Sequence, residues 1–133
     1  MENRIVELLS QLVGINSVNV TLSQGPGECQ IAEFVANYLN ALEMDAHIQT
    51  IDGQRANVVA VVPGQNRNRS LLLNAHLDTV GVEGMKDPFT LRPVGDRLLG
   101  RGAYDMKGSL AIMLVLAEYF TQQPPPLDIL LTF

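Results

Sequence analysis

Two strand-like segments that flank a helical one, near the end of the chain, restrict its fold more than any other feature. Ser70–Ala75 and Leu127–Phe133 are short and mainly apolar, as is typical of strands that are buried on both faces. Between them, Lys107–Phe120 is apolar almost all round a helix, so we expect this helix to be buried as well. A strand, a helix and a strand in this order form a crossover unit. The sequence therefore predicts a layered α/β domain with a partly parallel sheet.

The N-terminal half adds two helices and two strands to this unit. Apolar residues at helical spacing predict one helix over residues 5–14 and a second over residues 31–42. The Val-rich segment Asn57–Val62 predicts a strand, and Ala46–Ile51 predicts another strand before it. Three segments without a periodic pattern are expected to be loops: Asn16–Gly27, Gln65–Arg69 and His76–Tyr104. The last of these is nearly thirty residues long, and ordered loops of such a length are often functional.

The composition limits the kinds of partner and the compartment. With 133 residues, 47% of them hydrophobic, the chain has room for one ordinary domain with a sizeable core. Its net charge of −5 and its lack of a basic stripe argue against binding to nucleic acid or to an anionic membrane. The longest apolar run, Leu110–Ala117, is far shorter than the roughly 20 residues that span a bilayer. Cys29 is the single cysteine and no signal-peptide pattern is visible, so we expect a cytoplasmic protein.

The first candidate site residues directly follow the strand-like segment Ser70–Ala75. His76 and Asp78 are separated by one residue, so in an extended backbone their side chains share one face. A carboxylate in that place can accept the ring N–H of the histidine and leave the other nitrogen to bind a metal, or it can orient a catalytic base. Without a function, the two residues would form a surface His–Asp pair. The spacing alone does not decide between these interpretations.

The second candidate site lies where the long loop meets the predicted buried helix. Gly100 and Gly102 permit unusual backbone angles or a close backbone approach. Asp105 occupies the place of an N-cap residue, and helix capping alone would explain it. The functional alternative is that Asp105 presents its carboxylate to His76. Lys107, close to Asp105 in the sequence, is expected either to pair with it or to be solvated.

Patterns of several other enzyme classes are absent. The glycines from Gly100 onward do not have the dinucleotide-binding spacing, because Asp105 stands where that pattern requires glycine. A phosphate loop requires Gly-Lys, whereas Lys107 and Gly108 have the reverse order. No serine nucleophile elbow of the G-x-S-x-G type occurs. The second histidine, His47, has no acidic motif around it and is expected to be a partly exposed edge residue.

Together, the two candidate sites resemble the signatures of the co-catalytic zinc metallopeptidase and deacylase family. This family includes acetylornithine deacetylase, succinyl-diaminopimelate desuccinylase, aminoacylase and glutamate carboxypeptidase. Its first signature is His-x-Asp after an apolar strand, here within Leu71–Val80. Its second is Gly-Arg-Gly-x-x-Asp-Met-Lys-Gly, here intact over Gly100–Gly108, and Asp87–Phe89 in between also matches. The similarity spans essentially the whole chain and is strongest over residues 71–116.

The resemblance implies a fold and a set of roles for the site residues. The fold would be a layered α/β/α catalytic domain with a mostly parallel or mixed central sheet, and residues 1–133 would form its N-terminal part. His76 would bind one metal ion and Asp105 would bridge two, with zinc as the metal and cobalt or manganese as alternatives. Asp78 would be the catalytic residue that orients the histidine. The peptide bond between Asp105 and Met106 would be cis.

The resemblance also implies an activity. The parent protein would hydrolyse amide bonds in small N-acyl amino acids or peptides, and it would form a homodimer through an inserted domain. The family places a Glu-Glu pair shortly after the strand that here ends at Phe133, and the sequence contains neither that pair nor the inserted domain. We therefore expect the chain to be a fragment that is inactive alone. The alternative is a non-catalytic α/β binding module or a degenerate truncated paralogue.

Overall fold

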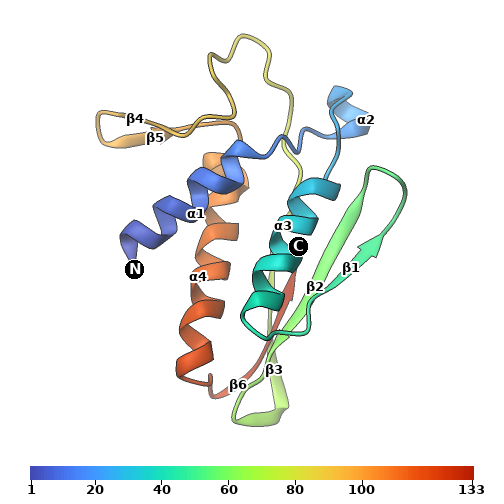
Figure 1. Ribbon diagram of the computed structural model, residues 1–133, viewed down its shortest axis with the longest axis vertical. Helices are drawn as coiled ribbons and strands as arrows, with labels where there is room; N and C mark the ends of the chain where they lie inside the picture. The colour runs from blue at the N-terminus through green and yellow to red at the C-terminus, as the bar shows by residue number, and fades with distance from the viewer.

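The computed structural model describes residues 1–133 as helices packed on a sheet (Figure 1). The helices are α1 (Glu2–Gly14), α2 (Val20–Ser23), α3 (Cys29–Ala41) and α4 (Gly108–Gln122), and one wide turn, η1 (Ala103–Lys107), precedes α4. The strands are β1 (His47–Thr50), β2 (Ala56–Val62), β3 (Asn66–Asn74), β4 (Arg92–Val94), β5 (Arg97–Leu99) and β6 (Leu127–Thr132). None of the helices has the length and the apolar character that a membrane crossing requires.

Four strands form a mixed sheet in the order β1-β2-β6-β3. β2 pairs antiparallel with both β1 and β6, whereas β3 and β6 run parallel. The parallel pairing aligns Leu71 with Ile129 and Asn74 with Thr132, and α4 connects these two strands along the chain. The crossover predicted from the two apolar segments and the helix between them is therefore confirmed, and so is the mixed sheet.

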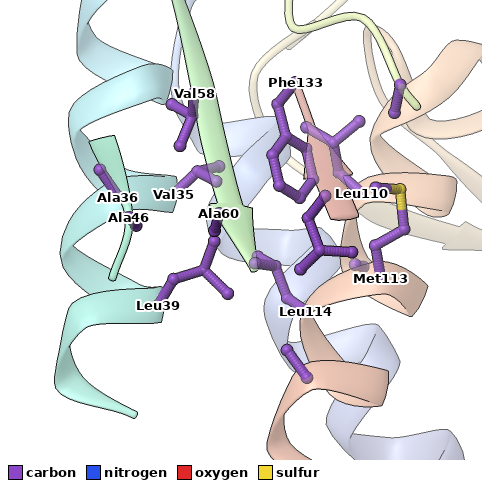
Figure 2. Close-up of a cluster of buried hydrophobic side chains, with 14 of the residues drawn as sticks. Val35, Ala36, Leu39, Ala46, Val58, Ala60, Leu110, Met113, Leu114 and Phe133 are labelled. Atoms are coloured by element: carbon purple, nitrogen blue, oxygen red, sulfur yellow. The ribbon is translucent and has the colours of Figure 1, made fainter. Parts of the chain in front are cut away.

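The hydrophobic core lies between the helices and one face of the sheet. Alternate residues of β2 are buried, and those between them are half-buried or exposed. In Figure 2, Val58 of β2 points toward the side of α3 that carries Val35, and Phe133 points toward Leu110 of α4. Residues 1–133 thus provide the sheet and one helical layer of the expected α/β/α arrangement, and the other face of the sheet has no helical layer.

The edge strand β3 differs from the prediction in two ways. It begins at Asn66, so most of the predicted loop Gln65–Arg69 belongs to it. Its leucines are not buried on both faces, because the exposed fractions of Leu71 and Leu72 are 49% and 58%. β3 has β6 as its only neighbour in the sheet. Its place in the sheet, which the apolar run itself does not reveal, therefore leaves these leucines exposed.

Two of the predicted loops contain short regular elements. The single turn α2 lies within Asn16–Gly27 and is capped by Asn19. Within His76–Tyr104, β4 and β5 form a two-stranded antiparallel hairpin. Its turn contains Gly95, whose φ of 60° lies in the left-handed region that favours glycine. Elements of three or four residues are too short to produce a periodic pattern, which is why the sequence did not predict them.

Lys107 connects the beginning of α4 to the end of α1. Its side chain is buried, and Nζ donates hydrogen bonds to the main-chain oxygens of Leu12, at 2.9 Å, and Ile15, at 2.7 Å. Burial lowers the pKa of Lys107 to about 8. The C-terminal end of α1 opposes this effect, because a positive charge is favourable at the C-terminal end of a helix. The prediction that Lys107 pairs with Asp105 or is solvated is therefore wrong.

Candidate metal site

His76 lies directly beyond the carboxyl end of β3, the position where ligands of α/β sheets usually bind. Its Nδ1 atom lies 3.0 Å from the main-chain oxygen of Asp78 and 3.2 Å from Asp78 Oδ1. Both neighbours of Nδ1 are acceptors, so they favour a ring proton on this nitrogen. The side chains of His76 and Asp78 lie together, as their spacing predicts.

Asp105 reaches His76 from η1, at the other end of the long loop. Its Oδ1 atom lies 2.9 Å from Nε2 of His76. The φ and ψ angles of Asp105 and Met106 are not helical, and the peptide bond between them is cis, as the resemblance implies. The N-cap residue of α4 is Lys107, and no side chain caps this helix. The capping alternative for Asp105 is therefore wrong, and its carboxylate faces the imidazole instead.

The two aspartates favour a positive charge on the imidazole. Burial lowers the pKa of His76, but the hydrogen bonds with Asp105 and with the Asp78 main chain outweigh this effect, and the two negative charges add to them. The pKa of His76 is therefore raised above its usual value. The side chains of His76 and Asp105 are 47% and 78% exposed, so solvent and ions can reach both of them.

Gly102 allows the segment that leads into η1 to approach the His76 loop. Its φ is +77°, and a Cβ at this position would lie 2.6 Å from Cγ2 of Thr79 and 3.3 Å from Cδ of Lys107. The main-chain oxygen of Gly102 accepts a hydrogen bond from the N–H of Lys107 at 2.8 Å. A glycine is therefore needed here for both its backbone angle and its lack of a side chain.

Two hollows meet at His76. The first, of about 320 Å³, is lined by His76, Asp78 and Asp105 together with residues of the Gly100–Tyr104 segment. The second, of about 450 Å³, extends from His76 and Asp78 along the ends of β2 and β6. Glu28 lines the second hollow. Both hollows therefore have His76 and Asp78 in their lining.

Sequence reasoning missed two residues near the site. Glu28 precedes α3 and is 8% exposed, its Oε2 has no hydrogen-bond partner, and burial raises its pKa. Asn19 donates from Nδ2 to Oδ2 of Asp78 at 2.8 Å. Each lies next to a helix start in the sequence, where Glu and Asn are common for structural reasons. Nothing in the sequence pattern therefore connects them to His76 or Asp78.

Two side chains in the candidate site can serve as metal ligands. His76 Nε2 and Asp105 Oδ1 face each other there, whereas Asp78 lies at the other nitrogen of the imidazole. The structure contains no group of three or more His, Cys, Asp or Glu side chains that could hold a metal ion. His47 lies on the exposed edge strand β1, as expected, and its Nε2 atom pairs with Asp45 at 3.1 Å, a contact that the sequence analysis did not predict. The arrangement supplies part of a coordination shell.

Sequence comparisons find a known family over the part of the chain that contains this candidate site. Residues 72–133 match the profile of the family described as Peptidase family M20/M25/M40. Residues 72–133 therefore resemble part of a peptidase M20 family domain, as the two signatures predict. The matched residues include His76, Asp78 and Asp105.

Curated relatives and solved structures extend the match over nearly the whole chain. Acetylornithine deacetylase of Salmonella arizonae is 29% identical over 96% of the chain, and Protein RocB of Bacillus subtilis is 28% identical over 90% of it. The chain spans 35% and 26% of the lengths of these two relatives.

Among solved structures, human carnosine dipeptidase 1 has a TM-score of 0.79 at 21% identity, with coverage of 98% of this chain and 31% of that one. A tripeptidase from Staphylococcus aureus has a TM-score of 0.72 at 21% identity, and the match covers 99% of this chain and 36% of the tripeptidase chain. At these identities the structures show a shared fold.

Proposed function

We propose that the protein to which this chain contributes is a metal-dependent hydrolase of amide bonds in small N-acyl amino acids or peptides. The observation that carries the proposal is the 2.9 Å approach of His76 Nε2 and Asp105 Oδ1 within the segment that matches the M20 family. The names of the relatives support the substrate class, because acetylornithine deacetylase acts on an N-acyl amino acid and carnosine dipeptidase on a peptide. Both substrates contain an amide bond.

The donor set at this place fits a metal such as zinc. Zinc accepts imidazole nitrogen and carboxylate oxygen as ligands, and it suits a histidine whose other nitrogen is hydrogen-bonded. His76 would bind through Nε2, Asp105 would bridge two ions through its carboxylate, and Asp78 would hold Nδ1. Cobalt or manganese are alternatives to zinc. When bound, the metal would lower the pKa of a water molecule and polarise the scissile carbonyl group.

Residues 1–133 place no third metal ligand beside His76 and Asp105. A catalytic zinc usually has three protein ligands, and the reaction also needs a proton-transferring base. The only acidic residues after Asp105 are Glu118 and Asp128. Glu118 pairs with Arg4 at 2.8 Å, and Asp128 pairs with Arg67 at 3.0 Å. We therefore propose that the 133-residue chain alone is inactive. From the composition and the family resemblance, we also propose that the complete protein is a cytoplasmic homodimer.

Zinc titration of the purified chain by calorimetry tests the site. We expect weak binding that His76→Ala and Asp105→Ala each abolish. His47→Ala is the matched control, since it removes the other histidine and leaves the site intact. Zinc binding that survives both site substitutions would refute the proposed ligands. Sub-micromolar affinity would refute the two-ligand site.

An activity assay tests the second part of the proposal. The chain is incubated with zinc and an N-acetylated amino acid, and release of the free amine is measured. We expect no turnover by the 133-residue chain, and turnover by a chain extended to the length of the curated relatives. Turnover by the short chain that is lost in His76→Ala would show that residues 1–133 already contain a complete active site.

A further inference from the structure

We propose that Asn19 is a positioning residue of the candidate metal site, because it holds the carboxylate of Asp78 that faces His76. The inference rests on the proposed function of that site. It assigns a role to the segment between α1 and α3, which contains neither of the proposed metal ligands.

The side chain of Asn19 has a defined orientation. Its Oδ1 atom accepts hydrogen bonds from the main-chain N–H groups of Thr21 and Leu22, both at 2.9 Å. Because Oδ1 is fixed by these two donors, the amide nitrogen must point the other way. There, Nδ2 donates to Oδ2 of Asp78 at 2.8 Å. The helix cap of α2 therefore sets the direction of the donor that Asp78 receives.

The main chain of the same segment holds the backbone on both sides of Asp78. The N–H of Asn19 donates to the main-chain oxygen of Thr79 at 2.8 Å, and the N–H of Thr79 donates to that of Ser17 at 2.9 Å. The buried hydroxyl of Ser17 donates to the main-chain oxygen of Leu77 at 2.8 Å. Residues 17–19 thus run beside residues 77–79 like a short parallel strand.

These contacts determine which atoms of Asp78 face the imidazole. Oδ2 is bonded to Asn19, which leaves Oδ1 at 3.2 Å and the main-chain oxygen at 3.0 Å from Nδ1 of His76. The side chain of Asp78 is 31% exposed, so without the Asn19 amide it is free to rotate toward water. The main-chain oxygen would still accept the Nδ1 proton. The loss of Asn19 should therefore weaken the orientation of His76 without abolishing it.

The test compares zinc binding by two variants with that of the unmodified chain. Asn19→Ser keeps an oxygen that can cap α2 and removes the amide donor. Ser23→Ala is the matched control, because Ser23 Oγ also joins α2 to the His76 loop by accepting the N–H of Gly81 at 3.0 Å, yet it does not touch Asp78. We expect Asn19→Ser to weaken zinc binding about three- to tenfold, the lower end of losses seen for such supporting residues. Ser23→Ala should leave the affinity unchanged.

A double-mutant cycle separates positioning from general loosening of the loop. In an Asp78→Ala background, Asn19→Ser should have no further effect on zinc affinity, because Asn19 acts through the carboxylate that is then absent. An equal loss of affinity in both backgrounds would overturn the proposal. Thermal unfolding of each variant verifies that it is folded at the temperature of the titration.

The ring tautomer of His76 gives a second readout that needs no metal. Long-range ¹H–¹⁵N spectra, recorded at a pH where the ring is neutral, should show a smaller Nδ1–H fraction in Asn19→Ser than in the unmodified chain. The reason is that Asp78 would then compete less well for the ring proton with Asp105 Oδ1, which lies 2.9 Å from Nε2. The chain has two histidines, so His47→Ala assigns the signals.

The two readouts separate the inference from the function on which it rests. If the unmodified chain does not bind zinc, the proposed function of the site fails, and the tautomer still decides the role of Asn19. If zinc binds through His76 but Asn19→Ser changes neither the affinity nor the tautomer, the role of Asn19 is refuted and the site stands.

Discussion

Replacing Gly102 by alanine should destabilise the chain for two separable reasons. The φ of +77° is unfavourable for any residue with a Cβ, which costs roughly 1–2 kcal/mol. The new Cβ would also lie 2.6 Å from Cγ2 of Thr79, and overlap of this kind in a packed region costs roughly 1–3 kcal/mol. We therefore expect the free energy of unfolding to fall by about 2–5 kcal/mol in total.

Two further variants divide this loss into its parts. Gly84 has a φ of +73° and no atom within 4 Å of a built Cβ, so Gly84→Ala should show the backbone cost alone. Thr79→Ser removes Cγ2, the atom that overlaps most. In a Thr79→Ser background, Gly102→Ala should therefore cost about as much as Gly84→Ala does in the unmodified chain, or roughly 1–2 kcal/mol.

Urea unfolding followed by circular dichroism measures these differences. An unchanged dependence on urea concentration would show that the midpoint shifts report stability. For 133 residues, each kcal/mol corresponds to roughly 3–4 °C in Tm, so Gly102→Ala should lower Tm by about 6–20 °C. The reasoning would be refuted if Gly102→Ala cost no more than Gly84→Ala, or if Thr79→Ser did not relieve the loss.

Three further predictions concern the contacts that hold the helices together. Leu114→Ala, at a fully buried position of α4, should cost about 2–5 kcal/mol in urea unfolding, whereas Ile112→Ala, at a position 47% exposed, should cost far less. Lys107→Met should lower stability by roughly 1–3 kcal/mol, because two main-chain oxygens at the end of α1 lose their donor; an unchanged Tm would contradict the importance of these bonds. The hydrogen bond from Arg4 lowers the pKa of Glu118 below its unfolded value of 4.5. The Arg4–Glu118 interaction therefore stabilises the fold above pH 4.5, and this stabilisation is lost as the pH falls through the folded pKa of Glu118. Glu118→Gln should therefore cost roughly 0.5–1 kcal/mol at pH 7, and the difference should vanish in acid unfolding series at low pH.

The pattern of apolar residues predicted the central part of the fold. The runs around β3 and β6 and the helix between them have lengths and compositions that few other arrangements accommodate, and they form the expected crossover. The pattern did not predict how deeply Leu71 and Leu72 are buried. Burial in a sheet depends on which strands lie on either side, and the sequence of one strand does not contain that information.

The candidate site was predictable to the extent that its residues are close in the sequence. The spacing of His76 and Asp78 predicts their shared face because the backbone between them is nearly fixed. The approach of Asp105 to His76 depends on a crossover that brings together residues 29 positions apart. Asn19 and Lys107 act across 59 and 92–95 positions, through contacts between irregular segments. No local pattern encodes such contacts, which explains why the sequence did not reveal them.

The buried bonds from Lys107 to the end of α1 have a consequence for the order of events in folding. The candidate site is assembled from three segments, near residues 19, 76 and 105, which are far apart along the chain. Contacts of such long sequence separation form slowly, because the entropy of closing the intervening loops is lost before the contacts are gained. Formation of the His76–Asp105 pair should therefore coincide with the last cooperative step of folding. A probe placed at this pair would report when these long-range contacts have formed.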